Sequence, residues 1–283
     1  MPIVGLDTQY QYRTTTAGSL AVPGRVNSAD FGMDQSAEHL TGAGGDDSVV
    51  MSMIEPKGSG AMWVQSVTFP ALALKTVINA LPPVIAEMQG GDVGGTMRKH
   101  TDCYLDVLEF NLEKGGALKA DFEWLALTGT TGDATVAAAA LAKNLILQWH
   151  AATVLLGGSG YGCQSVKARL ENGLKLDTDL DAKTAGVERM PQSVSPGDSK
   201  VSIDVEFDSY PAVDPYVANP ATVALVVQCK NTESSPKVFT LTVTNLHPLG
   251  TPVEVASGED KVTFKFTAEA DYNDLTALTF ALA

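Results

Sequence analysis

The stretch Lys200–Tyr210, KVSIDVEFDSY, alternates apolar and polar residues along its length. Successive side chains of a β-strand point to opposite faces, so this pattern predicts a half-buried strand. The predicted inner face is apolar and consists of Val201, Ile203, Val205 and Phe207. The predicted outer face carries a row of carboxylates, Asp204, Glu206 and Asp208. A carboxylate row of this regularity bears on function as well as on fold.

Two further segments have the same design. Residues 104–112 form a predicted strand, Lys114-Gly115-Gly116 a turn, and residues 118–124 the returning strand with Asp121 and Glu123 outward. A second hairpin is predicted over residues 165–181, with Asn172-Gly173 as its turn. Its returning strand places three acids outward, Asp177, Asp179 and Asp181. Two hairpins are too few to predict a repeat protein.

The whole chain reads as a mainly β protein. Many short strand patterns are separated by Gly, Pro, Asn and Asp turns, which is typical of a β-sandwich or barrel. One or two short helices are predicted, one of them over 134–142 behind Asp133 as N-cap. Residues 1–60 are rich in Gly, Ser, Thr and Asp and predict an extended N-terminal arm with loops and at most short strands. Residues 61–283 then form a single β-rich domain.

Composition limits the classes of function. The 283 residues are 45% hydrophobic, enough for a sizeable core, and the net charge is −14. That charge disfavours attractive binding to nucleic acid or to an anionic membrane, both of which need Lys and Arg. No apolar run is long enough for a membrane-spanning helix, and the N-terminus lacks a secretory pattern. Cys103, Cys163 and Cys229 are widely spaced and predict buried, reduced thiols.

Catalytic and metal motifs are weak. The sequence has no phosphate-binding glycine loop, no nucleophile elbow and no paired histidines, so no enzyme activity or cofactor is predicted. One segment imitates a calcium loop: four acids match the first, third, fifth and twelfth positions of an EF-hand, namely Asp177, Asp179, Asp181 and Glu188. Ala182 stands where that loop needs Gly, and a strand precedes it. A solvated acidic edge is therefore the preferred interpretation, with calcium as the alternative.

Four blocks of the chain resemble the tail tube, or major tail, proteins of long-tailed bacteriophages. They are CYLDVLEFNLEKGGALKADFEWLALTGT (103–130), YGCQSVKARLENGLKLDTDLD (161–181), SVSPGDSKVSIDVEFDSYP (193–211) and TPVEVASGEDKVTFKFTAEADYNDLTALTFALA (251–283). The resemblance covers roughly residues 100–283. It implies a β-sandwich or barrel-like subunit with a flanking helix, a structural role and no chemistry of its own. It also implies a place in the virion tail after synthesis in the host cytoplasm.

The same resemblance implies rings, typically hexameric, whose inner sheets join into one continuous barrel around a channel. Stacked rings would carry DNA without binding it specifically, with tail tip, terminator and tape measure proteins as further partners. Acidic walls would repel phosphates. The candidates for lining the lumen are the three acidic rows: Asp204, Glu206 and Asp208; Asp177, Asp179 and Asp181; Asp121 and Glu123. The alternative place for each row is the outer surface of the tube, where acids serve solubility. Alternatives are a head decoration or baseplate protein, or the tube of a contractile injection or type VI secretion system.

Overall fold

The computed structural model describes residues 8–41, 47–92, 96–133, 146–177, 190–208, 222–231, 236–249, 264–271 and 276–283. These contain sixteen strands and one 3-10 helix, η1 (Pro70–Ala73). The strands are β1 (Thr8–Arg13), β2 (Arg25–Thr41), β3 (Asp47–Trp63), β4 (Ile85–Asp92), β5 (Thr96–Glu113), β6 (Lys119–Asp133), β7 (Gln148–Leu156), β8 (Ser159–Gly160), β9 (Cys163–Glu171), β10 (Lys175–Asp177), β11 (Ser193–Ser195), β12 (Lys200–Phe207), β13 (Val223–Lys230), β14 (Val238–Pro248), β15 (Phe264–Asp271) and β16 (Leu278–Leu282).

The mainly β prediction is confirmed. No α-helix lies in the described part of the chain, and η1 is a single turn that begins at a proline. The helix predicted over 134–142 lies outside the described residues. Among those residues no helix is long and apolar enough to cross a membrane.

Fourteen strands form one continuous antiparallel sheet that folds over on itself. Its main path runs β2-β3-β6-β5-β9-β12-β15-β14-β13-β7-β8, while β4 and β1 branch from β5, and β16 branches from β14. The first half of β5 pairs with β4 and its second half pairs with β9. Strand β14 likewise pairs first with β16 and then with β15. Irregular backbone marks both changes of partner, with Asp102 and Asn245 at φ 51 and 54.

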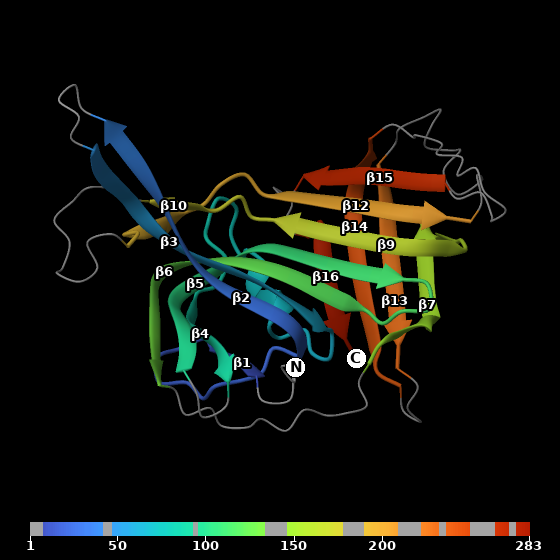
Figure 1. Ribbon diagram of the computed structural model, residues 1–283. Helices are drawn as coiled ribbons and strands as arrows, with labels where there is room; N and C mark the ends of the chain where they lie inside the picture. The colour runs from blue at the N-terminus through green and yellow to red at the C-terminus, as the bar shows by residue number, and fades with distance from the viewer. Residues whose placement is uncertain are drawn as a thin grey trace.

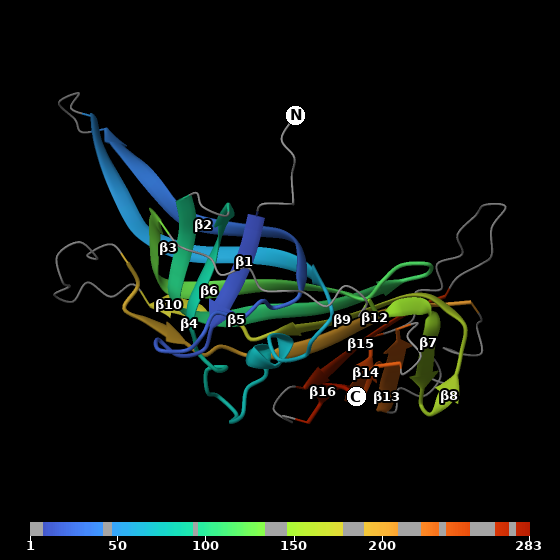
Figure 2. The ribbon, with the colours of Figure 1, turned by 90° about the horizontal axis from the view of Figure 1, so that it is seen from below.

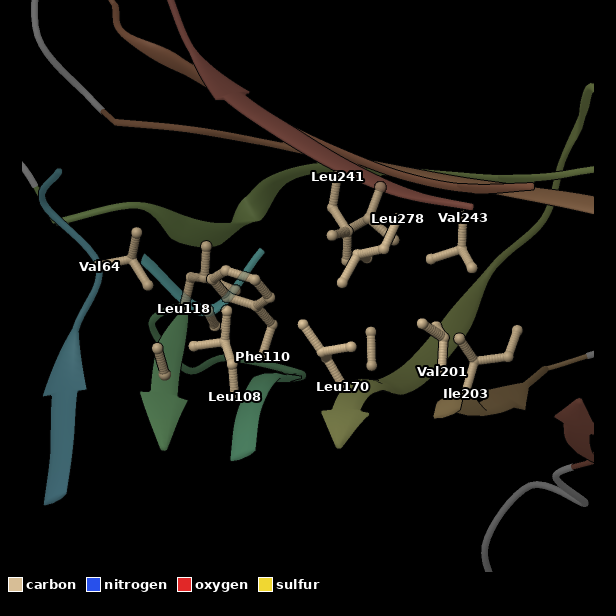
Figure 3. Packing of buried hydrophobic residues seen from close by; sticks show 14 of the residues in the cluster. Val64, Leu108, Phe110, Leu118, Leu170, Val201, Ile203, Leu241, Val243 and Leu278 are labelled. Carbon is tan, nitrogen blue, oxygen red and sulfur yellow. The ribbon is translucent and has the colours of Figure 1, made fainter. Parts of the chain in front are cut away.

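The folding of the sheet produces two packed layers. Strands β6, β5, β9, β12 and β15 form one layer, and β16, β14, β13 and β7 form the other (Figure 2). Figure 3 shows Leu108, Phe110, Leu170, Val201 and Ile203 pointing toward Leu241, Val243 and Leu278 across the gap between the layers. The Phe110 ring lies 5.3 Å from Phe239 and 5.2 Å from Phe280. The molecule is therefore a β-sandwich with an apolar core.

The N-terminal strands extend the same core with aromatic rings. Tyr10 of β1 lies 5.7 Å from Phe31 of β2, so the two ends of the succession β1-β4-β5-β6-β3-β2 curl toward each other. Phe69 packs edge-on against Tyr12 and Phe122, each at 4.9 Å. Strand β3 passes close over these rings because it carries Gly58 and Gly60: a Cβ at either position would collide with Trp124 or Phe122.

Strands β2 and β3 correct the prediction for the start of the chain. We expected short strands at most before residue 60, and that was wrong: β2 and β3 have 17 residues each and pair as a hairpin that projects from the body (Figure 1). We interpreted the small residues of this region as a sign of loops. In the structure they allow a strand to pass close to bulky aromatic side chains. The division of the chain into an arm over 1–60 and one domain over 61–283 stays a prediction.

The first predicted hairpin is confirmed and the second is wrong. Strands β5 and β6 pair across the Lys114-Gly115-Gly116 turn with the expected faces. Strand β9, however, pairs with β5 and β12, and β10 pairs with β11 in a separate two-stranded sheet. The reason lies at Asn172, which is fully buried and donates hydrogen bonds from Nδ2 to the backbone oxygens of Ala73 and Leu105, both at 2.9 Å. These hydrogen bonds hold the Asn172 side chain in the interior of the protein, away from the surface position that the predicted hairpin turn would give it.

Candidate functional site: two contrasting sheet faces

The strongest candidate site is the outward surface of the layer β6-β5-β9-β12-β15. We call it the charged face. Antiparallel register brings thirteen described charged side chains together on it: Glu109 and Glu113 on β5; Lys119, Asp121 and Glu123 on β6; Lys167, Arg169 and Glu171 on β9; Lys200, Asp204 and Glu206 on β12; Lys265 and Glu269 on β15. Two of the predicted acidic rows, those of β6 and β12, therefore lie on one surface.

Strand β12 has the predicted alternation. Its burial pattern places Val201, Ile203, Val205 and Phe207 inside, and Asp204 and Glu206 outside. The acidic row is nevertheless not an isolated wall, because the neighbouring strands present other side chains to it. Asp204 lies opposite Lys167 of β9, accepts a 2.7 Å hydrogen bond from Thr267 Oγ1, and has Lys265 Nζ at 3.7 Å.

Basic side chains on the charged face are held in ion pairs. Glu109, whose side chain is 8% exposed, pairs with Lys167 at 2.9 Å and with Arg169 at 3.2 Å. Arg169 also pairs with Glu171 at 2.6 Å, and Lys200 pairs with Glu269. With Lys265 beside Asp204, four of the five cations on this face thus form ion pairs with carboxylates of the same molecule.

Most of the described charged side chains without an ion pair on this face are acidic. Among the described residues of this face, Glu113, Asp121, Glu123 and Glu206 make no ion pair within 4 Å, and Lys119 is the one cation without such a pair. Burial raises the pKa of Asp121, with the nearby Glu109 carboxylate adding to it. Eight described carboxylates against five cations leave a net charge of −3 on this face, and the unpaired acids are the groups that present it to solvent.

The face is also hollowed over the β3-β6-β5 strands. A shallow depression of about 330 Å³ is lined by Ser59, Ala61, Glu109, Asp121 and Glu123, among others. Arg169 of β9 also lines it. Two of the unpaired acids, Asp121 and Glu123, therefore border this open concavity.

The remaining predicted acids lie elsewhere. Asp208 follows the end of β12, where it accepts a hydrogen bond from Gln164 Nε2 and its backbone N–H donates to Gly162 O at 2.9 Å. Asp177 belongs to β10, away from the charged face in the pairing scheme, and accepts a 3.2 Å hydrogen bond from Ser193 Oγ. The other members of the calcium-like set, Asp179, Asp181 and Glu188, lie outside the described residues. The described chain has no group of three potential metal ligands.

The opposite surface of the sandwich is almost free of charge. We call the outward surface of β16-β14-β13-β7 the neutral face. Its described side chains include Thr153 and Leu155 of β7, Ala224, Val226 and Gln228 of β13, Val238, Thr240, Thr242 and Thr244 of β14, and Thr279 and Ala281 of β16. Lys230, at the end of β13, is the one charged side chain among the described residues of this face. The two layers of the sandwich therefore differ in surface charge.

Two buried thiols and a buried histidine in the core are neutral. Burial raises the pKa of the Cys163 and Cys229 thiols to about 12, which keeps them protonated. His100 is buried, and its Nδ1 accepts a 3.0 Å hydrogen bond from Trp124 Nε1. Burial, with the charge of Arg98, lowers the pKa of His100 to about 4. None of these groups lies on either outer face.

Sequence reasoning missed two features of the site. The first is the placement of cations beside the acidic rows. The alternation Lys167-Ala168-Arg169 indicates that two cations share one face of a strand. The sequence does not show which acids lie opposite them, because that depends on the register between strands. The second is a buried polar cluster in which Lys75 Nζ donates to Ser199 Oγ at 2.6 Å and reaches Asn172 O and Gly197 O, both at 3.4 Å. A lone lysine in a loop gave no signal for that cluster.

These features define an all-β sandwich subunit whose two outer surfaces differ in charge. A family model described as "Phage tail tube protein" matches residues 9–273. The chain belongs to that family and is a structural subunit of a phage tail tube, a component of the virion tail that assembles with copies of itself. No curated protein matches the chain.

Proposed function

We propose that copies of this chain close into stacked rings, hexameric as the sequence resemblance implies, and that the charged face lines the channel through which DNA passes. The observation that carries this proposal is the contrast between the two faces. A tube has one inner and one outer wall, and this sandwich has one charged and one neutral outer surface.

Electrostatics favours the charged face for the inner wall. DNA carries a dense row of phosphates, and Lys or Arg free to meet them would bind the duplex and slow it. On the charged face four of the five cations are held by carboxylates, so that Lys119 is the one free cation among the described residues there. Four acids remain free, namely Glu113, Asp121, Glu123 and Glu206. Each copy adds a net negative contribution, so the wall repels phosphates while its ion pairs keep the surface ordered.

Sheet edges favour closure through neighbouring copies. Strand β2 is at the end of the main sheet and, among the described residues, has one paired edge only. A long open edge invites pairing with another strand, and a head-to-tail contact that repeats by rotation closes a ring. Tail tip, terminator and tape measure proteins are the further partners that the resemblance implies.

Charge reversal tests the lumen assignment. We expect the triple variant Asp121→Lys, Glu123→Lys, Glu206→Lys to assemble tubes but to slow DNA ejection by about tenfold or more, because free cations would then face the phosphates. The matched control is Thr153→Lys, Thr240→Lys, Thr279→Lys, which adds three cations to the neutral face and should eject at the wild-type rate. Ejection of the first variant at the wild-type rate, or an equal loss in the control, would contradict the assignment.

A further inference from the structure

One loop carries an unusual concentration of exposed apolar side chains. It joins η1 to β4 and spans residues 74–84. Val77 is 61% exposed, Ile78 45% and Val84 41%, and these are three of the five exposed large hydrophobic residues in the described chain. Single exposed hydrophobic residues are ordinary on protein surfaces, but a group of them within eight residues marks an interaction site.

The loop is anchored at its base. Lys75 is 5% exposed, and its Nζ donates to Ser199 Oγ at 2.6 Å and to Gly197 O at 3.4 Å. Asn172 Nδ2 holds Ala73 O at 2.9 Å. These bonds tie the start of the loop to the segments that lead out of β9 and into β12.

The tip of the loop has a defined turn. The Ala80 backbone N–H donates to Val77 O at 3.2 Å, and Asn79 adopts the left-handed backbone region at φ 60. The adjacent Pro82 is buried and Pro82-Pro83 restrict the returning chain. The exposed aliphatic side chains are therefore presented by an ordered loop, and an ordered loop loses less conformational entropy on binding.

We propose that this loop, residues 76–84, is a docking knob that packs against a second copy of the chain in the assembled tube. The proposal rests on the proposed function, since it names one contact between copies. Every copy carries a net charge of −14, so like charge opposes the approach of two copies. Residues 76–86 contain no charged side chain, and they offer apolar area where two such copies can meet without that cost.

The first test is assembly of the purified full chain. We expect the double variant Val77→Ser, Ile78→Ser to raise the protein concentration needed for tube formation by about tenfold or more, because central apolar contacts dominate interfaces. Its thermal unfolding should match the wild type, since both side chains are exposed. The matched control is Leu249→Ser, which removes an apolar side chain that is 47% exposed elsewhere. Tube formation at the wild-type concentration, or an equal loss in the control, would overturn the proposal.

The second test does not depend on the effect of a substitution on affinity. A photo-crosslinking amino acid placed at position 78 should give covalent dimers in assembled tubes and none in dilute monomer. Tubes that form normally but give no dimers on illumination would overturn the docking knob alone. Failure of the wild-type chain to form tubes under any condition would instead contradict the proposed function, so the two failures are distinguishable.

Discussion

Carboxylates in this protein have different roles that depend on their immediate neighbours. Glu109 is nearly buried between Lys167 and Arg169, and Glu87 is held in the same way by Arg13 and Lys99, the latter at 3.0 Å. Desolvated carboxylates of this kind need such partners and fix the strands that supply them. Glu206, in contrast, is exposed and free of ion pairs among the described residues. An exposed carboxylate without an ion pair, such as Glu206, contributes to the electrostatic potential outside the protein.

His100 gives a prediction at the residue scale. Its folded-state pKa of about 4 lies below the usual 6.5, so the unfolded chain takes up a proton between these values while the folded chain does not. The contribution of His100 to folding stability is therefore complete above pH 6.5 and falls as the pH drops toward 4, by about 3 kcal/mol in total. Urea unfolding at a series of pH values measures this loss.

The control for His100 is His100→Gln, which cannot titrate and keeps an oxygen that can accept the Trp124 hydrogen bond. The free energy of unfolding of this variant should fall less steeply between pH 6.5 and 4 than that of the wild type. Arg98 and Asp30 are the charged groups that act on His100, and both remain in the variant. An identical slope for the two proteins would show that His100 does not titrate as proposed.

Elements with strict alternation were predictable from sequence. Strand β12 and the β5–β6 hairpin have the expected inner and outer faces because burial of one face fixes a period of two. The partners of these strands were not predictable in the same way. Asn172-Gly173 has the composition of a hairpin turn, yet the buried hydrogen bonds of Asn172 to residues far along the chain decide its role.

The long strands β2 and β3 were missed for a related reason. Their Gly, Ser and Asp content indicates loop when it is judged by local propensity. The tertiary setting overrides that propensity, since Gly58 and Gly60 fit against Trp124 and Phe122 where larger residues could not. The charged face was half predicted: its acids could be read from each strand, but the pairing cations appear only once the register is known.

A pair of adjacent substitutions tests the two faces of β12. Phe207 is fully buried, so Phe207→Ala should lower the free energy of unfolding by about 3–5 kcal/mol. Glu206 is exposed, so Glu206→Ala should change it by about 0.5 kcal/mol or less. Chemical denaturation measures both values. Similar costs for the two variants would mean that the strand does not present these faces to core and solvent.

The whole molecule combines a common core with two unlike surfaces. Its layers share one apolar cluster, so the charged face and the neutral face are held in a fixed relation to each other. The irregular backbone at Asn245 lies where β14 passes from β16 to β15, and this pairing lets one continuous sheet supply both layers. A subunit of this construction can present one face inward and the other outward in a tube.

A cryo-electron microscopy reconstruction of tubes assembled from the purified chain, at a resolution that traces β12 and β14, tests the central claim most directly. We predict that Asp121, Glu123 and Glu206 point into the channel and that Thr240, Thr242 and Thr279 face the outside. A channel lined by the neutral face, with the charged face on the exterior or buried between copies, would contradict the account.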